Sequence, residues 1–567
     1  MLKQLLTLAL ALLPAALQAG PAEKDPFMNA LTSELDRSMS GLRRAEKTPL
    51  YYLGYELTVS SFHYISARSG AIDYEDGAPS VKLDIDVRVN DMALDNTHQV
   101  KGGSAVNVYT EPVDLSVALD GDEAALRARV WEFTDAAFKK AQENFTKVKM
   151  NKAVTAAEDD PSPDFSPAPP ERFYETVTLP EPDLAAWRAR LRKYSALLGA
   201  YPFAYDSGAS LLYENENRYL VNSDGTRVKT GANYITLRYR LASRTTDGMV
   251  LERGEDYSAA SFGRLPSDDK VRADIAGSIA ELKALRAAPV VEPYTGPAIL
   301  RNRAAGVYFH EIIGHRLEGH RQKLEDSGQT FAKKVGQKVT SEIVTLYDDP
   351  TLAEYAGVQL RGHYLYDDEG VKAGRASLIE KGVLKGFLMN RSPIKDFASS
   401  NGHGRRSSGL PTVARMGNTV MEASSPVPYA ELRARLVKET VRQGKPFGLL
   451  FDDISGGFTN TNRGGAQAFK VQPLMVYKVY ADGRPDELVR GVDIVGTPLT
   501  SFAKITAAAD DPGVFNGSCG AESGWVPVSS VSPSILISEL EVEKSEKSQE
   551  KPPVLSPPMH DDKEAWR

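Results

Sequence analysis

The chain has 567 residues, of which 42% are hydrophobic and 25% are charged. This composition is ordinary for a globular protein and excludes a collagen-like or wholly disordered chain. Lys and Arg total 68 against 75 Asp and Glu, a net charge of -7, so the chain has no global excess of positive charge and we expect no nucleic-acid partner.

The N-terminus has the pattern of a signal peptide over residues 1–19. An apolar run from Leu5 to Leu13 is followed by Pro14 and by the small-residue region that ends in Gln18-Ala19-Gly20. The run is shorter than the roughly 20 apolar residues of a membrane-spanning helix. We expect cleavage and a periplasmic or secreted product without stable membrane insertion; the alternative is a segment kept as a membrane anchor.

Residues 20–290 carry signals for both helices and strands. Helical spacing and capping residues predict helices that begin at Asp25-Pro26 and that cover about 122–145, 183–198 and 268–286. Alternation of apolar and charged residues predicts a strand over 81–89, and two more strands are expected around 218–221 and 235–241. The order of these elements predicts an N-terminal α+β domain, sandwich-like, with helices packed on a sheet.

A second domain is expected because a chain of this length exceeds the size of one hydrophobic core. The proline-containing segment 290–296 is the predicted boundary. Residues 291–543 combine short strands and glycine-rich turns with one helix near 429–443, which predicts a mainly antiparallel β domain. The tail, residues 544–567, is charged and proline-rich and is expected to be mobile unless residues 552–555 dock on the body.

The residues with the clearest chemistry lie in the segment 306–320. His310, Glu311 and His315 are similar to the helix motif H-E-x-x-H, in which two imidazoles hold zinc, but the spacing is one residue longer. Residues five apart lie about 140° apart around a regular α-helix, against about 40° for residues four apart. We therefore predict a π-bulge at Gly314 that lets both rings meet one ion. The plain alternative is a pair of surface or core histidines.

Cys519 is the only cysteine, so it cannot form a disulfide within its own chain. It is either buried and inert or bound to a metal. Its glycine-rich surroundings, residues 516–524, can bend a thiolate toward a distant ion, and a catalytic zinc usually has three protein ligands and one open position.

These observations predict a catalytic metal centre at the start of the second domain. It holds one Zn2+ per chain with three ligands, His310, His315 and Cys519. Glu311 acts as the general base on zinc-bound water in peptide hydrolysis. Glu318 and His320 are candidate substitute ligands, or partners that orient the imidazole N–H groups.

Several blocks of sequence share one order and spacing with a known family. The pattern H-E-x-x-x-H-x-L-E-G stands at residues 310–319, and later blocks lie at 374–382, 401–406, 411–418, 454–457 and 518–520. These blocks resemble the TldD/PmbA family of zinc metallopeptidases. The resemblance implies the ligands and base given above, a two-domain α+β fold with a barrel-like C-terminal domain, a homodimer or a heterodimer with a related subunit, and a cleft for unfolded peptides or small polypeptides.

Two further sets of residues are candidates for substrate binding. Ser455, Gly456 and Gly457 are expected to offer backbone groups to an extended peptide by strand addition, unless they form a plain turn. His403, Arg405 and Arg406 are candidates for binding a substrate carboxylate, with a solvated loop as the alternative. His320 stands where the family commonly has Asp, so the role of that position is open.

Two other functions compete with the metallopeptidase. One is a non-catalytic peptide-binding or assembly subunit with a structural zinc, which requires a closed site with a fourth ligand. The other is a thiol hydrolase that uses Cys519 as the nucleophile. Chelators inhibit only the zinc peptidase, whereas alkylating agents inhibit the thiol enzyme.

Overall fold

A computed structural model describes residues 25–44, 48–100, 113–115, 122–154, 160–178, 181–324, 327–464, 468–547, 550–555 and 557. The predicted signal peptide, residues 1–19, and the last residues of the tail lie outside this part. Among the described helices, none combines the length and the apolar character that crossing a membrane requires.

The N-terminal domain is built on one long, curved sheet. Its strand order is β3-β2-β1-β5-β6-β4, and β7 pairs with β6. The strands are β1 (Leu50–Arg68), β2 (Ala71–Val89), β3 (Val113–Asp114), β4 (Arg172–Tyr174), β5 (Asp206–Asn222), β6 (Arg227–Arg244) and β7 (Val250–Ala259). The helices are α1 (Pro26–Leu42), α2 (Glu123–Val154), α3 (Leu184–Gly199) and α4 (Asp268–Ala287).

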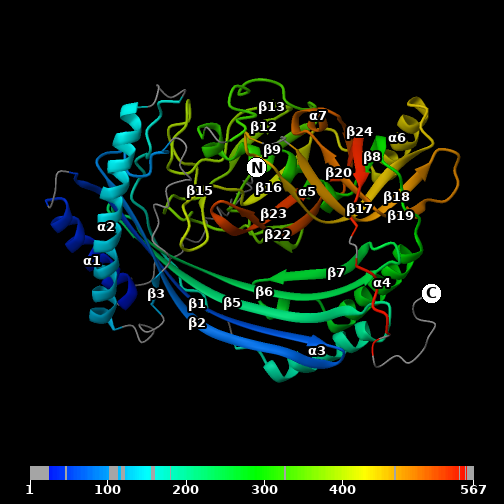
Figure 1. The fold of residues 1–567 in the computed structure, drawn as a ribbon, viewed down its shortest axis with the longest axis horizontal. Coiled ribbons are helices and arrows are strands. Elements are labelled where there is room, and N and C mark those ends of the chain that lie inside the picture. The colour runs from blue at the N-terminus through cyan, green and yellow to red at the C-terminus, as the bar shows by residue number, and fades with distance from the viewer. Residues whose placement is uncertain are drawn as a thin grey trace, which may run out of the picture.

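The helices cover one face of this sheet, two at each end (Figure 1). Tyr55 and Leu57 of β1 pack with the apolar side chains of α1 and α2, and Ile65 of the same strand packs with those of α3 and α4. These three residues have the same parity in the strand, so their side chains share one face. The other face, which carries Glu56 and Arg218, is turned toward the C-terminal domain.

The C-terminal domain contains a closed five-stranded barrel, because β17 pairs both with β8 and with β18. The barrel strands are β8 (Tyr294–Leu300), β17 (Phe447–Thr459), β18 (Phe469–Tyr480), β20 (Val492–Gly496) and β24 (Ile535–Lys544), with β19 (Glu487–Val489) and β21 (Ile505–Ala508) attached. The β8–β17 pair is parallel and the other barrel pairs are antiparallel. The predicted α+β class with a barrel-like C-terminal domain is confirmed.

A six-stranded sheet lies beside the barrel, in the order β13-β12-β9-β16-β23-β22. Its strands are β9 (Val344–Asp348), β12 (Ala376–Glu380), β13 (Val383–Leu384), β16 (Asn418–Ala423), β22 (Gly513–Ala521) and β23 (Gly524–Ser532). The short pairs β10 (Glu354–Tyr355) with β11 (Val358–Gln359) and β14 (Gly404–Arg405) with β15 (Val413–Ala414) complete the strands. The helices are α5 (Asn302–Ile312), α6 (Tyr429–Arg442) and α7 (Pro498–Phe502).

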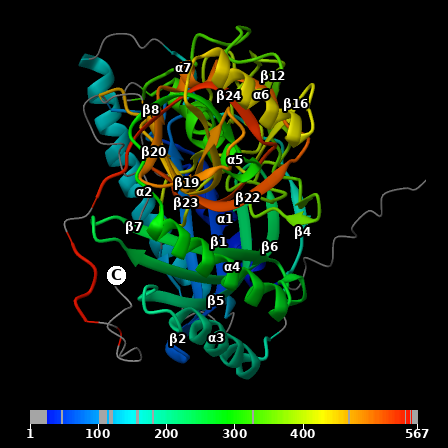
Figure 2. The ribbon, with the colours of Figure 1, turned by 90° about the vertical axis from the view of Figure 1, so that its right-hand side faces the viewer.

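Ion pairs and the C-terminal tail join the two domains. The Arg218 guanidinium contacts Asp368 at 2.8 Å and Glu56 at 2.9 Å, and Arg406 contacts Glu56 at 3.0 Å. After β24 the chain passes back along the N-terminal domain, where Lys547 lies 2.7 Å from Asp247 (Figure 2). Of the segment 552–555, Val554 and Leu555 are almost fully exposed, so these two side chains do not dock on the body.

Candidate metal centre

Helix α5 places His310 and Glu311 in the centre of the C-terminal domain. It follows barrel strand β8 directly and contacts β17 and β18 as well as β22 and β23. Gly306 permits this close packing, because a Cβ atom there would lie 3.2 Å from the carbonyl oxygen of Ser530. All of its residues from Ala304 to Ile312 are buried.

The predicted π-bulge is wrong. The α-helix ends at Ile312, Ile313 has φ -128° and ψ -41°, and a 3-10 turn follows over Gly314–Leu317. This break turns His315 back toward His310, so the two rings lie 4.9 Å apart at an interplanar angle of 88°. Gly314 is needed for packing instead, because a Cβ atom there would lie 2.2 Å from the Met416 sulfur.

The structure brings Cys519 to both histidines. Its Sγ atom lies 3.2 Å from His310 Nε2 and 3.3 Å from His315 Nε2, and one donor atom of each residue lies within 4.8 Å of the other two. Cys519 comes from β22, which forms a hairpin with β23. Two segments about 200 residues apart in the sequence therefore meet at one buried cluster.

The charges in this cluster favour a thiolate. Burial by itself raises the pKa of Cys519, but the adjacent His315 and His310 outweigh burial and hold it well below its ordinary value. Burial likewise opposes protonation of the two histidines, yet the Cys519 sulfur raises the pKa of both. The sulfur is therefore in the form that binds metals.

The donor set fits zinc. With Zn–S at about 2.3 Å and Zn–N at about 2.0–2.1 Å, sulfur and nitrogen of a tetrahedral site lie roughly 3.6 Å apart, close to the separations found here. Two imidazoles and a thiolate are ligands that zinc favours. Nδ1 of His315 lies 3.2 Å from Glu318 Oε1, which leaves Nε2 of that ring for the ion.

Glu311 is placed beside the cluster with one oxygen free. Its Oε2 atom is buried and makes no hydrogen bond to any residue that the structure describes. Burial raises the pKa of the Glu311 carboxyl, and His310 and His315 offset only part of this rise. Gly457 of β17 makes room for the side chain, since a Cβ atom at Gly457 would lie 2.7 Å from Glu311 Cγ.

Arg415 is a part of this centre that the sequence reasoning missed. Its Nη2 atom donates to Cys519 Sγ at 3.1 Å, and its Nε atom lies 3.3 Å from Glu318 Oε1. Arg415 lies in the block 411–418, which the family resemblance singled out without assigning it a role. The contact joins residues more than a hundred positions apart, so no local sequence pattern predicts it.

The two residues named as substitute ligands have other partners. Glu318 is fully buried and accepts from Arg321 Nε at 2.7 Å besides its contacts with His315 and Arg415. These cations lower the pKa of Glu318 to about 2 against the opposing effect of burial. His320 Nε2 lies 2.5 Å from Glu522 Oε1, so it is part of a neighbouring polar cluster.

The proposed carboxylate-binding role of His403, Arg405 and Arg406 is corrected by the structure. His403 is fully buried and contacts Asp348 at 3.2 Å. Arg405 donates to the main-chain carbonyls of Met416 and Pro527, both at 2.7 Å. Arg406 forms an ion pair with Glu56 across the domain interface. Each of these side chains is used for internal contacts.

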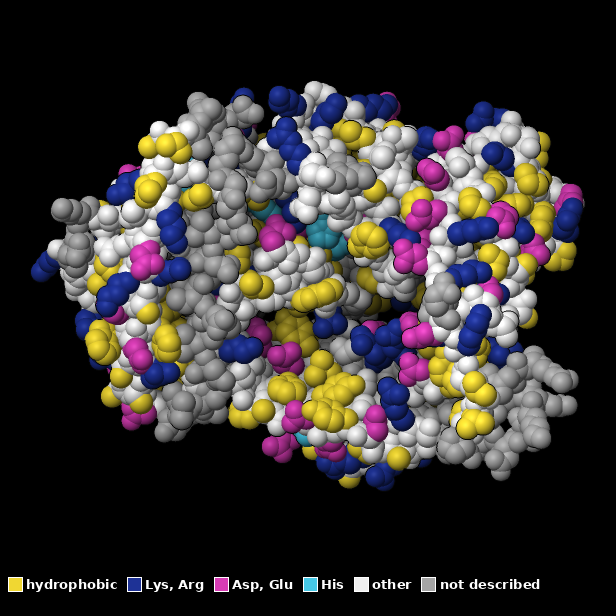
Figure 3. Space-filling view, viewed as in Figure 1, with side chains coloured by type: hydrophobic (Ala, Val, Ile, Leu, Met, Phe, Trp, Pro, Cys, Tyr) yellow, Lys and Arg dark blue, Asp and Glu magenta, His cyan; other side chains and the backbone are white. Residues whose placement is uncertain are grey.

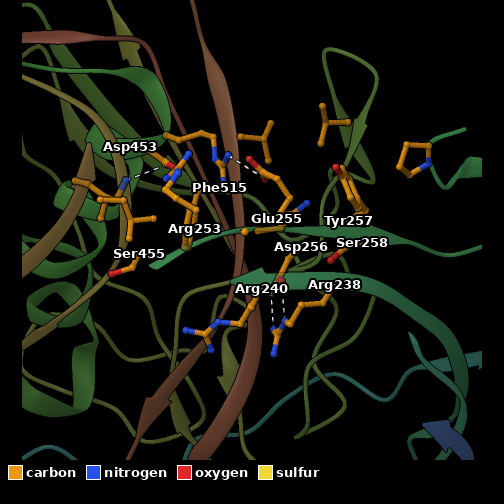
Figure 4. A pocket seen from close by; sticks show the side chains of 18 of the residues that line it. Arg238, Arg240, Arg253, Glu255, Asp256, Tyr257, Ser258, Asp453, Ser455 and Phe515 are labelled. Atoms are coloured by element: carbon orange, nitrogen blue, oxygen red, sulfur yellow. Dashed lines mark hydrogen bonds and ion pairs between the residues drawn. The ribbon is translucent and has the colours of Figure 1, made fainter. Parts of the chain in front are cut away.

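A large cavity lies at the domain interface, where Figure 3 shows a hollow between the two halves of the molecule. Its volume is about 690 Å³, and its walls come from β6 and β7 of the N-terminal domain and from β17 and β22 of the C-terminal domain. Figure 4 shows Arg253 with Asp453 and Arg238 with Asp256 at this cavity. The same strands continue to the site, β17 to Gly457 beside Glu311 and β22 to Cys519.

The sequence is similar to those of known metallopeptidases. Residues 293–544 match the model of the PmbA/TldA metallopeptidase C-terminal domain. The chain is 31% identical to a metalloprotease TldD homolog of Haemophilus influenzae, over 51% of this chain and 58% of the relative. It is 27% identical to a zinc metalloprotease TldD homolog of Saccharolobus solfataricus, over 43% of this chain and 51% of the relative. The chain thus spans little more than half the length of these relatives.

Among solved structures, the fold is similar to that of TldE from Thermococcus kodakarensis. The TM-score is 0.57 with 16% sequence identity, and the match covers 91% of this chain and 100% of that chain. At this level of identity the likeness concerns the fold of both domains.

Proposed function

We propose that this chain is a zinc-dependent peptidase of the TldD/PmbA type that hydrolyses peptide bonds of unfolded peptides or small polypeptides, since residues 293–544 match the PmbA/TldA metallopeptidase C-terminal domain. One observation carries the proposal most directly: a buried carboxylate oxygen of Glu311 without a hydrogen-bond partner among the described residues stands beside the His310, His315 and Cys519 cluster. That arrangement provides both a metal-binding donor set and a base.

In the proposed reaction, His310, His315 and Cys519 would hold the zinc ion, which would supply Lewis-acid chemistry. Glu311 takes a proton from the attacking water and returns it to the leaving amine. The raised pKa of Glu311 suits both steps, because a base whose pKa lies nearer neutral pH also serves as an acid. Glu318 holds the His315 ring through Nδ1, and Arg415 donates a hydrogen bond to the Cys519 sulfur.

The exposed part of β17 supports an extended substrate. Strand β8 pairs with β17 only from Leu449 to Phe451, whereas Ser455 and Gly456 lie farther along toward Glu311. A Cβ atom at Gly456 would meet nothing within 4 Å, so the backbone there is open. An unfolded peptide that adds to this edge would bring its carbonyl groups past the metal centre.

The two competing functions are less well supported. A closed structural site needs a fourth ligand, but His320 is bound to Glu522, and Glu318 uses its oxygens on His315, Arg321 and Arg415. A Cys519 nucleophile would use one adjacent imidazole as its base, but that function gives no role to the second imidazole at the same sulfur or to the buried Glu311 carboxylate.

The proposal is tested by incubating the protein with a pool of unstructured peptides and analysing the products by mass spectrometry. We expect cleavage that a zinc chelator abolishes and that added Zn2+ restores, with zinc-loaded protein resistant to alkylation. Cleavage that survives the chelator and stops on alkylation would instead establish the thiol hydrolase.

A further inference from the structure

A second, smaller cavity lies between the two domains. Its volume is about 270 Å³, one wall is formed by β5 and β6, and the other is formed by residues 359–366, which begin at the end of β11. Ser258 and Gln359 line both this cavity and the large one. The two cavities are therefore adjacent parts of one interdomain space.

Two arginines, Arg218 and Arg361, line the small cavity. Within the described part of the chain, Arg361 forms no ion pair with a carboxylate. Its main-chain N–H donates to Asn516 Oδ1 at 3.2 Å and to Ser529 Oγ at 2.8 Å, which fixes this loop on β22 and β23. The Nε atom of the half-buried guanidinium is itself buried and makes no hydrogen bond to the described residues. The guanidinium stays charged at neutral pH, although burial lowers its pKa.

The other arginines around this space all have partners. In the large cavity the ion pairs are Arg238–Asp256, Arg240–Glu252, Arg253–Asp453, Arg264–Glu354 and Arg303–Glu255. In the small cavity Arg218 pairs with Glu56 and Asp368. A partly desolvated guanidinium without an acceptor lowers the stability of the folded chain. An anion from outside the chain would supply the acceptor that Arg361 lacks.

The acidic groups nearest to Arg361 compete weakly for it. Asp256 accepts from Arg238 Nε at 2.6 Å. Burial raises the pKa of Glu214 and raises that of Glu216 to about 7, so the Glu216 carboxyl is only partly ionised at neutral pH. The phenol of Tyr234 also faces Arg361 and is neutral in this range, because burial raises its pKa.

Arg361 is attached to the strand that carries the metal-centre residue Cys519. Asn516, which holds the Arg361 backbone, lies in the same strand as Cys519, three residues earlier. At about 3.3 Å per residue this is about 10 Å along the strand, the length of about three residues of an extended peptide. Side chains three positions apart lie on opposite faces of a strand, so the connection to the small cavity runs through the large cavity, which β22 also lines and which shares Ser258 and Gln359 with the small one.

We propose that Arg361 binds a carboxylate of the peptide substrate and so determines which peptides are cleaved. The inference rests on the proposed peptidase function and adds a specificity site to it. The carboxylate is either the C-terminal α-carboxylate or the side chain of an Asp or Glu of the same peptide. A guanidinium binds such a group through two parallel hydrogen bonds.

The test uses full-length zinc-loaded protein and one unstructured peptide, synthesised in three forms: a free C-terminal acid, a C-terminal amide, and an amide with a single Glu in place of Gln at successive positions. Binding of each form is measured by calorimetry on the Glu311→Gln variant, and kcat/KM is measured on the wild type. Both are repeated with Arg361→Gln. The matched control is Arg172→Gln, which removes one charge from the exposed side chain of Arg172 in β4, outside both cavities.

We expect a peptide with the carboxylate to bind about tenfold or more tightly than its neutral form. Arg361→Gln should remove this difference while leaving the neutral peptide unchanged, and Arg172→Gln should preserve the difference. Preference for the free acid identifies the chain end as the source, and preference for one Glu position identifies a side chain. Equal binding of charged and neutral forms by Glu311→Gln, where Arg361 is intact, overturns the proposal. If the carboxylate peptide binds more tightly than the neutral one but no peptide is cleaved, the peptidase function is refuted and the carboxylate site at Arg361 stands.

Discussion

The Nη2 atom of Arg415 lies 3.1 Å from the Sγ atom of Cys519 and 2.8 Å from the carbonyl oxygen of the same residue. Arg415 is fully buried, and it also contacts Glu318, the carboxylate that holds His315. Arg415 thus contacts both the Cys519 thiolate and the carboxylate that orients His315, so the ligand in the turn after α5 and the ligand in β22 depend on each other.

We predict that Arg415→Met weakens zinc binding about 10–100-fold, as loss of a contact that supports a ligand commonly does. It should also lower the free energy of unfolding by about 3 kcal/mol, because Glu318 loses one of its buried partners. Arg415→Lys keeps the charge and should lose less of both. Chelator competition and denaturant unfolding measure the two effects; unchanged zinc affinity in Arg415→Met would contradict this role.

Gly457 and Gly456 provide a matched pair on β17. A Cβ atom at Gly457 would lie 2.7 Å from Glu311 Cγ, whereas one at Gly456 would meet nothing within 4 Å. Displacing a catalytic base by about 1 Å costs about a hundredfold in rate, so Gly457→Ala should lower kcat by that amount with zinc retained. Gly456→Ala should change kcat far less. Equal losses in the two variants would show that Gly457 does not position Glu311.

Zinc should stabilise the fold, because its ligands join α5 to a strand about 200 residues later in the sequence. A metal that binds only the folded chain raises its stability by mass action. Removal of zinc should therefore lower the Tm, and added Zn2+ should restore it. His310→Ala is the control, since its Tm should respond little to either treatment. A wild-type Tm that is insensitive to the chelator would argue against the site.

The buried carboxyls of Asp367 and Glu369 should make stability depend on pH. Burial raises the pKa of Asp367 well above its ordinary value and that of Glu369 to about 7. A carboxyl with a raised pKa binds more protons in the folded state, so stability falls as pH rises from about 4.5 to about 7, by about 3 kcal/mol for Glu369.

Glu369→Gln removes one of these titrating groups and keeps an acceptor for the Arg391 N–H, which lies 2.6 Å from Glu369 Oε2. Urea unfolding at pH 5 and pH 8 should therefore show a smaller fall in stability for the variant than for the wild type. An equal fall in both proteins would show that Glu369 is ionised throughout this range.

Much of the fold could be predicted because its elements carry local signals. Asp25 caps α1 by accepting from the N–H groups of Phe27 and Met28, and Asp183 caps α3. The strands predicted at 218–221 and 235–241 are parts of the much longer β5 and β6. Charged residues such as Glu216 and Arg218 interrupt the apolar pattern there, because their face of the sheet lines the interdomain space.

That the three candidate ligands come together could be predicted from a single cysteine and two histidines five residues apart. The backbone conformation between the histidines could not be predicted. A π-bulge and a helix break both bring residues five apart together, and the choice depends on how Gly314 packs against Met416, a residue about 100 positions later. The roles of Arg415 and Arg361 depend in the same way on long-range contacts that leave no periodic pattern.

The central claim is that Glu311 acts as the base beside zinc held by His310, His315 and Cys519. The most direct test measures zinc content and peptide cleavage for the wild type and for Glu311→Gln in parallel. The account predicts one zinc per chain in both proteins and a loss of cleavage of about a thousandfold in the variant. Full cleavage by Glu311→Gln, or by metal-free wild type, would contradict it.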